Sequence, residues 1–462
     1  GFTSTASATA GYFAIGYGAK SMGLAGATVS NPQDSITASV NPAGMALVGE
    51  RADFSVRFFS PIREAELKTT AVGGTFDVDD KSRRNLFIIP NMGFTQEVKG
   101  NDKLWWGLSI YGNGGLNSTY DRNLYDEAFA VLGAAQFGIP PSGPFPGCTP
   151  GAVPPAPDAP PPAGCGSLVP EGSTTGFPNT SVLGVDLSQA IFAPTLSYEV
   201  NEKHSLGASL LIGVQRFSAR GLGDFNMPPF VTSPPANGLT NNDSDWSYGA
   251  GVRLGWIGEV SPRVTLGLAA ASKVYMTEFD KYDQLFAENG DLDIPANLTA
   301  GITVKVTPKL KISFDYQRIF YEDVNSIAND GPILTPFGTG IPPGGGPLGA
   351  NDGLGFGWED TDTYRLAAEY EHNDQWTLRA GFAYLEQPIP DDQVLFNILA
   401  PAVVEKHVTL GFTYSPNKSS EWNFAYMHAF EEKVKSSQTA FGIPGSIQMY
   451  ENSVDLSYSL LF

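Results

Sequence analysis

Hydrophobic and polar positions alternate with a period of two along most of the chain. Near the C-terminus, for example, Val454, Leu456 and Tyr458 alternate with serine and aspartate. Successive side chains of a β-strand point to opposite sides, so this period predicts strands with one apolar face. The pattern predicts fourteen strands. Their approximate ranges are 52–59, 84–97, 103–111, 186–200, 204–214, 246–256, 264–270, 298–306, 310–316, 364–370, 376–384, 406–414, 421–430 and 453–462.

Short and long connections between these strands strictly alternate. Outer-membrane barrels have this arrangement, with short periplasmic turns and long extracellular loops, whereas soluble sandwiches mix their connections through Greek keys. The C-terminus then falls on the short-turn side. Short turns lie near 99–102, 201–202, 261–262, 307–308, 372–374 and 415–420. Long loops lie near 60–83, 113–184, 218–244, 280–291, 324–360, 388–402 and 434–446.

The composition agrees with strands that cross a membrane. Charged residues make up 16% of the chain and aromatic residues 12%, against roughly 25% charged residues in a soluble domain. No window has the run of about 18 apolar residues that a transmembrane helix needs. We therefore predict an all-β, 14-stranded antiparallel transmembrane β-barrel in the outer membrane of a Gram-negative bacterium. Tryptophans near strand ends fit its aromatic girdles: Trp105, Trp106, Trp246, Trp256, Trp376 and Trp422.

Residues 1–50 differ from the barrel segment 51–462. Up to Gly49 they contain two charged side chains, Lys20 and Asp34, among many small residues. One interpretation is a disordered leader. We favour an N-terminal plug, or hatch, inside the lumen, because the lumen of fourteen strands is too wide for wall side chains alone to fill.

The predicted extracellular loop 113–184 contains a proline-rich insertion at 138–170. Asn123 is placed to cap a short helix that begins at Leu124. Cys148 and Cys165 are the two cysteines of the chain, and the cell surface is an oxidising compartment, so we expect a disulfide between them. Metal binding is disfavoured because no histidine is near them in the sequence.

Several motifs resemble the FadL family of outer-membrane transporters for fatty acids and hydrocarbons. The N-terminal motifs resemble the family's plug, and the later ones agree with its fourteen-strand layout. The motifs are Gly23-Leu24-Ala25-Gly26-Ala27, Asp34, Asn41-Pro42-Ala43-Gly44, Asp362-Thr363-Tyr364-Arg365-Leu366, Trp376-Thr377-Leu378-Arg379-Ala380-Gly381, Pro388-Ile389-Pro390 and Tyr426-Met427-His428.

The resemblance implies a mechanism. A hydrophobic ligand binds an apolar groove between the loops at 113–184 and 218–244 and then enters a pocket in the upper barrel. After the plug moves, the ligand leaves sideways through an opening beside a kinked third strand. Gating residues of the plug would be Asn41, Pro42 and Ala43, and the opening would lie at Gly112, Asn113, Gly114 and Gly115. Lateral release also avoids pushing a hydrocarbon through water, at about 0.8 kcal/mol per methylene.

Residues for ligand binding follow from the same comparison and from the pattern. Alignment with the family's carboxylate-binding arginine falls near Arg216, although strand parity points Arg216 outward. Leu124, Phe129 and Leu132 are candidates for the outer groove, the alternative being a helix that packs on the barrel rim. Phe2 is a candidate for filling the pocket from below, the alternative being an unanchored terminus. Four arginines point into the lumen by parity, where they either hold a ligand carboxylate or form an internal charge network, which we favour: Arg57, Arg253, Arg365 and Arg379.

Other functions are disfavoured. The net charge of −20 argues against a nucleic-acid partner, which needs clustered cations. The histidines lack metal-ligand spacing and no nucleophile elbow occurs, so we expect no enzyme, cofactor or metal. An aqueous porin and, less so, an outer-membrane lipid hydrolase remain alternatives. Expected partners are hydrophobic small molecules (long-chain fatty acids or hydrocarbons), outer-membrane lipid, lipopolysaccharide and the barrel-assembly machinery, which reads a terminal aromatic such as Phe462. The resemblance implies a monomer.

Overall fold

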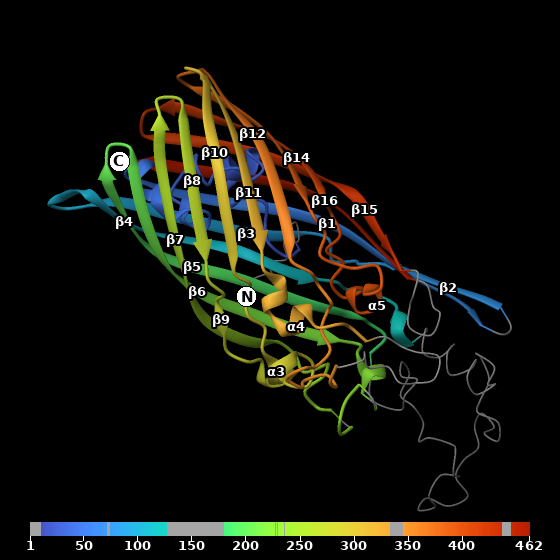
Figure 1. The fold of residues 1–462 in the computed structure, drawn as a ribbon. Coiled ribbons are helices and arrows are strands. Elements are labelled where there is room, and N and C mark those ends of the chain that lie inside the picture. Colours follow the sequence, from blue (N-terminus) through green and yellow to red (C-terminus); the bar gives the residue numbers. More distant parts are fainter. Residues whose placement is uncertain are drawn as a thin grey trace, which may run out of the picture.

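The computed structural model describes residues 11–71, 74–126, 180–226, 228, 230–234, 236–332, 345–436 and 445–462. Its strands form one antiparallel sheet that closes where β16 pairs with β1. Of the sixteen strands, β2 and β9 extend the pairing of β1 and β7, and the other fourteen form the wall. The predicted closed 14-stranded barrel is therefore confirmed (Figure 1).

The strands vary in length because several continue beyond the membrane-facing band. They are β1 (Arg51–Ala71), β2 (Gly74–Lys81), β3 (Phe87–Val98), β4 (Asn101–Asn117), β5 (Gly184–Asn201), β6 (His204–Arg220), β7 (Asp245–Ser261), β8 (Val264–Ala271), β9 (Tyr275–Met276), β10 (Asn297–Thr307), β11 (Leu310–Ile319), β12 (Thr361–Asn373), β13 (Trp376–Leu385), β14 (Lys406–Asn417), β15 (Ser420–Lys435) and β16 (Gly445–Leu461).

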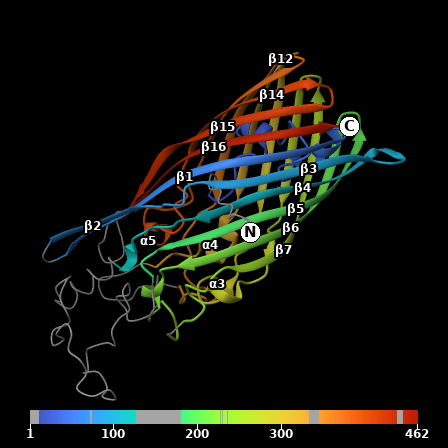
Figure 2. The same cartoon turned by 180° about the vertical axis from the view of Figure 1, so that it is seen from behind.

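Helices in the described residues are short. They are α1 (Ala19–Gly23), α3 (Ala287–Gly290), α4 (Asn325–Ala328), α5 (Val394–Asn397), η1 (Thr37–Ser39), η2 (Pro42–Leu47), η3 (Gly223–Phe225), η4 (Asp280–Tyr282) and η5 (Tyr321–Asp323). In the described part of the chain, no helix has the length and hydropathy needed to cross a membrane. α3, α4, α5 and β2 gather at one end of the barrel and the C-terminus lies at the other (Figures 1 and 2).

Strand side chains sort by face as the alternation predicts. On β1, Phe54 is exposed on the outer surface, while its neighbours Asp53 and Ser55 are buried in the lumen. The same order holds on β16, where Leu456 is exposed and Asp455 is buried. An apolar exterior with a polar interior is the arrangement that a lipid-embedded barrel requires.

The segment 60–83 was predicted to be a loop and is instead a β-hairpin. β1 continues to Ala71 and pairs with β2, and Lys81 forms an ion pair with Glu64 at 3.1 Å. Outward positions of this hairpin carry charges, because the hairpin projects beyond the hydrocarbon layer. The hairpin therefore lacks the apolar outward face by which the other strands were predicted.

Residues 11–48 lie inside the barrel and form the plug, with almost all of their side chains buried (Figure 1). Small wall residues allow the plug backbone to approach closely. A Cβ on Gly267 of β8 would lie 2.2 Å from the Val29 carbonyl oxygen, and one on Gly381 of β13 would lie 2.7 Å from the Ala25 nitrogen. Glycine is therefore required at both contacts.

Candidate functional site

A small apolar cavity lies inside the extracellular end of the barrel. The plug residue Tyr12 lies on one side of it, strands β4, β5 and β6 form the wall, and extracellular loops complete the lining. None of the described residues that line it is charged, and half of the lining side chains are aromatic. The lining residues are Tyr12, Leu116, Val185, Leu187, Phe217, Phe286, Leu292, Ile327, Phe356 and Trp358.

Aromatic contacts hold the loops over this cavity. The rings of Phe217 and Phe286 lie 4.7 Å apart, centroid to centroid. Trp358 donates from its indole Nε1 to Asn397 Oδ1 at 2.6 Å, and the Asn397 amide donates to the Phe356 carbonyl oxygen. Buried indole and amide groups need such partners, so this bonding fixes both aromatic rings at the cavity.

The wall beside this cavity is interrupted between β3 and β4. Pairing between the two strands ends at Met92 and Ile110, although β4 continues to Asn117 and stays paired with β5. The register of β4 against β5 shifts between Gly112 and Gly114, which leaves Asn113 as a bulge. We call the stretch Gly112–Asn117, which β3 does not pair, the wall break.

Backbone of the plug occupies the free edge of β4 at the wall break. Ala14 N donates to Asn113 O and Gly115 N donates to Tyr12 O, each at 3.3 Å, and Phe13 forms a β-bridge with Gly114. A Cβ on Gly114 would lie 2.0 Å from the Tyr12 oxygen, so glycine alone permits this contact. We call Tyr12–Ala14 the N-terminal segment.

Side chains from β3 and β1 contact the rest of the wall break. Gly112 N donates to Asn91 Oδ1 at 3.2 Å, and a Cβ on Gly112 would lie 2.6 Å from Ile89 Cγ2. Arg63 of β1 donates to the Asn117 carbonyl oxygen. The break is therefore a loss of pairing between β3 and β4 that other groups of the protein cover.

A chain of buried amides joins the wall break to the loops over the cavity. Asn113 Nδ2 donates to Gln189 Oε1 at 3.1 Å, and Gln189 Nε2 donates to Gln215 Oε1 at 2.7 Å. Gln215 Nε2 donates to the carbonyl oxygen of Leu292, a cavity residue, at 2.8 Å. The bulge, β5, β6 and the loop before β10 are thus one hydrogen-bonded unit.

Asn41, Pro42 and Ala43 pack against a different part of the wall from Gly112–Gly115. Asn41 Nδ2 donates to the Trp256 carbonyl oxygen at 3.1 Å. The Ala43 oxygen accepts hydrogen bonds from hydroxyls of β5 and β6. The placement of this element beside the glycine run, which the resemblance implied, is therefore wrong; the N-terminal segment occupies that position.

Two of the four lumen arginines are ion-paired. Arg57 lies 3.2 Å from Asp455 and also donates to the Gly16 oxygen of the plug. Arg379 lies 3.0 Å from Glu369. These pairs form part of an internal charge network.

The other two arginines line a small polar cavity between plug and wall. Arg253 donates to the oxygens of Ala38 and Ser39 in the plug and to the hydroxyl of Tyr111, so it bridges the wall and the plug. Arg365 donates to Gln317 Oε1 of β11, which is a bond between two wall strands.

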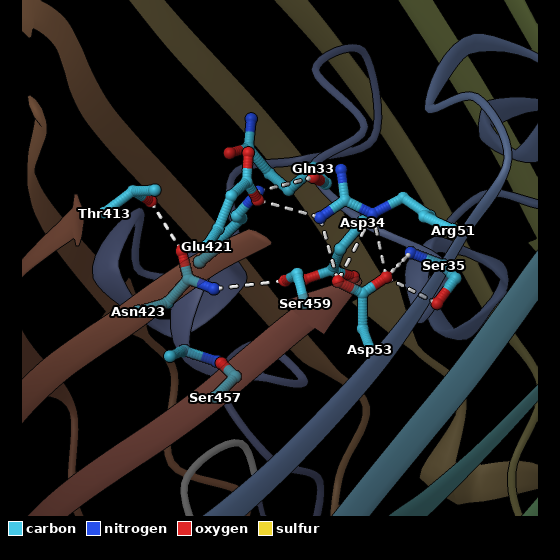
Figure 3. A network of polar contacts seen from close by, with 12 residues as sticks. Gln33, Asp34, Ser35, Arg51, Asp53, Thr413, Glu421, Asn423, Ser457 and Ser459 are labelled. Carbon is cyan, nitrogen blue, oxygen red and sulfur yellow. Dashed lines mark hydrogen bonds and ion pairs between the residues drawn. The ribbon is translucent and has the colours of Figure 1, made fainter. Parts of the chain in front are cut away.

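Charged groups fix the plug at the periplasmic end of the barrel (Figure 3). Arg51 lies 2.8 Å from Asp53 and 2.9 Å from Glu421, and Lys20 of α1 lies 2.5 Å from Glu421. Asp53 also accepts a 2.8 Å hydrogen bond from the backbone N–H of Ser35. The plug is therefore attached through three basic and acidic side chains of the wall.

The structure places two of the predicted ligand residues. Arg216 pairs with Asp186 at 2.9 Å and is not among the residues that line the apolar cavity. Leu124 is fully buried, as in a helix that packs on the barrel rim. Its helix begins as expected, with Asn123 Oδ1 accepting from Tyr125 N. Phe2, Phe129, Leu132, Cys148 and Cys165 lie outside the described residues.

One carboxyl in the cavity-lining loop has a shifted pKa. Burial, with the negative charges of Asp293 and Glu288, raises the pKa of Asp291 to about 7. Asp291 precedes the cavity residue Leu292. Among the residues that the structure describes, no group of three or more histidine, cysteine or acidic side chains could hold a metal ion.

Solved structures show the same fold along nearly the whole chain. The P. putida toluene transporter TodX is 16% identical over 97% of this chain and 99% of its own, with a TM-score of 0.62. A Pseudomonas aeruginosa FadL homologue is 17% identical over 98% and 99%, with a TM-score of 0.62. The Ralstonia pickettii toluene transporter TbuX is 18% identical over 97% and 99%, with a TM-score of 0.59.

Sequence comparison identifies the family. No curated protein sequence matches the chain. The profile of the family described as "Outer membrane protein transport protein (OMPP1/FadL/TodX)" matches residues 164–457, which is more than half of the chain. The chain therefore belongs to the OMPP1/FadL/TodX family of outer-membrane transport proteins.

Proposed function

We propose that this protein carries hydrophobic compounds passively across the outer membrane, through the apolar cavity and sideways out of the wall break. The ligand is captured by the extracellular loops at 113–184 and 218–244 and enters the cavity. Movement of the N-terminal segment, which belongs to the plug at residues 1–50, then frees the edge of β4. The ligand leaves into the membrane beside Gly112–Gly115.

The observation that carries this proposal is the position of the apolar cavity next to a strand edge that β3 does not pair and that only the plug covers with backbone hydrogen bonds in the described residues. Leu116 both lines the cavity and lies in the wall break. A sixteen-carbon chain that passed through a wet pore instead would lose roughly 12 kcal/mol of burial, at about 0.8 kcal/mol per methylene. Sideways exit keeps the ligand in apolar surroundings throughout.

The lining favours an uncharged ligand over a fatty acid. A carboxylate buried without a counterion is costly, and the described lining residues include no basic side chain. Aromatic rings, by contrast, pack favourably edge to face against other rings. The solved structures of toluene transporters with this fold lead to the same choice. We therefore propose neutral hydrocarbons, monoaromatic ones included, as the preferred cargo.

Filling the cavity tests this function. Val185→Trp places a large ring into the cavity, and we expect uptake of labelled toluene by cells that express it to fall about tenfold or more, because overfilled cavities reject ligands. Ala380→Trp, on the outer face of β13, is the matched control and should leave uptake unchanged. Labelled palmitate, run in parallel, should enter more slowly than toluene through the unmodified protein.

Two results would contradict the proposal. Normal toluene uptake by a correctly folded Val185→Trp variant would show that the cavity is not on the route. Large steady currents from the unmodified protein in planar bilayers would favour the aqueous porin instead. Folding of each variant is checked by its heat-dependent shift on a gel.

A further inference from the structure

A second interruption of the wall lies between β5 and β6, away from the apolar cavity. Pairing runs to Phe192 and Ile212 and resumes at Thr195 and Ser209 in the same register, so the pairs at Ala193 and Pro194 are missing. Proline has no N–H to donate to the neighbouring strand, and it is rare inside a sheet for that reason.

Local hydroxyls compensate for the missing pairs. Thr195 Oγ1 lies 3.0 Å from the Ala193 carbonyl oxygen, to which it donates, and 2.6 Å from Ser209 Oγ. Backbone groups inside a bilayer need partners within the protein, so these bonds make the interruption tolerable.

The membrane-facing surface is hollow at this point. One cross-strand row of outward residues runs from Trp106 through Leu196 and Ala208 to Leu254. Ala208 is the small member of the row, and a surface depression lies above it. We call this depression the outer hollow. Its lining is Trp106, Gly107, Pro194, Thr195, Leu196, Ala208, Ser209, Leu210, Val252 and Leu254.

The position of the outer hollow indicates what fills it. None of its described lining residues is charged, and it lies in the half of the wall nearest the short periplasmic turns, where phospholipid forms the leaflet. The turns below it expose both signs of charge: Asp102 and Lys103 on one side, Glu202 and Lys203 on the other. Paired charges of this kind match a zwitterionic head group better than a strongly anionic one.

We propose that the outer hollow binds one acyl chain of a zwitterionic phospholipid from the periplasmic leaflet, with the head group at the two turns. The chain covers the wall where the backbone ladder is interrupted. Plug residues press on the same wall from within: a Cβ on Gly207 would lie 2.3 Å from the Ala43 nitrogen. The lipid chain on the outside and the plug on the inside therefore both pack against the part of the wall where β5 and β6 lack backbone pairs.

Native mass spectrometry in mild detergent tests this site, with palmitoyl-oleoyl phosphatidylethanolamine as the probe. Ala208→Leu fills the hollow, and we expect its affinity for the lipid to fall about tenfold, because the displaced chain loses about two methylene groups of burial. Leu196→Ala removes one side of the hollow and should also weaken binding. Ala380→Leu, an equivalent outward change on β13, should bind as the unmodified protein does.

Equal lipid retention by the unmodified protein and Ala208→Leu would overturn the proposal. So would a result in which Ala208→Leu loses bound toluene but keeps phosphatidylethanolamine, because the hollow would then hold cargo. Toluene uptake through the apolar cavity is measured in a separate assay. A negative result for lipid binding therefore does not bear on the proposed transport function, and the reverse also holds.

Discussion

At the scale of single residues, the interior of the barrel depends on charges held in pairs. Arg379 and Glu369 lie 3.0 Å apart and both are about 6% exposed. Arg379 also donates to Thr413 on the neighbouring strand. An ion removed from water and left without its partner is costly, so each member of such a pair depends strongly on the other.

Breaking this pair should therefore destabilise the barrel. We expect Arg379→Gln to lower the free energy of unfolding by about 2–3 kcal/mol, measured by urea unfolding from lipid vesicles; the loss stays below that of an ion with no partner because Lys311 still lies 3.0 Å from Glu369. Arg318→Gln is the matched control, because Arg318 pairs with Asp360 at 3.1 Å while 40% exposed, and exposed pairs contribute about 0–1 kcal/mol. Equal losses in the two variants would show that burial of the Arg379 pair is not what matters.

A pH effect is expected in the loop over the cavity. The pKa of Asp291 is raised to about 7, so the folded loop binds a proton more tightly than the unfolded chain does. Its stability should then rise as pH falls from 8 through 7, with no further gain below about 4, the ordinary range for a carboxyl. Hydrogen exchange of residues 286–296 measures this. Asp291→Asn should flatten the pH dependence, and an unchanged profile in that variant would refute the assignment.

At the scale of elements, the wall break is the exit that the proposed function requires. Two substitutions change it in opposite directions. Ile89→Ala removes a side chain that closes the break, and Gly112→Val adds one there, since a Cβ on Gly112 would lie 2.6 Å from Ile89 Cγ2. The first enlarges the path between β3 and β4 and the second narrows it.

We expect Ile89→Ala to raise the rate of toluene uptake. Gly112→Val should lower that rate about tenfold or more, because adding even one methylene group to a well-packed site is unfavourable. Toluene binding, measured separately on purified protein, should stay unchanged in both, because neither residue lines the apolar cavity. Ala380→Val on the outer face of β13 is the control. Uptake that changes in the same direction in both variants would argue against exit at this point.

At the scale of the whole molecule, the plug separates the two ends of the barrel. The described plug residues fill the lumen and are attached to the wall at the periplasmic end by Lys20, Arg51 and their carboxylate partners. Deletion of residues 1–45 should therefore raise single-channel conductance in planar bilayers well above that of the unmodified protein. An unchanged current from a folded deletion variant would show that these residues do not block the bore.

Local periodicity accounts for the barrel. Strand number, face alternation and the sorting of short and long connections follow from it, because burial in lipid imposes one pattern on every strand. The plug motifs were identified instead by their resemblance to the FadL family. Where a strand leaves the lipid that rule stops, and the hairpin of β1 and β2 was missed. The lumen arginines were found by parity, but their partners lie on strands and plug residues far away in sequence.

The cavity and the end of pairing between β3 and β4 depend on contacts between segments that lie far apart in the sequence. Phe286, Phe356 and Trp358 belong to loops without periodicity, and closure of the barrel brings them together with Tyr12. The glycine run at Gly112–Gly115 signalled an irregular strand, yet its neighbour proved to be the N-terminal segment rather than Asn41–Ala43. Contacts between distant segments depend on how the plug folds back into the lumen, and no local pattern encodes that path.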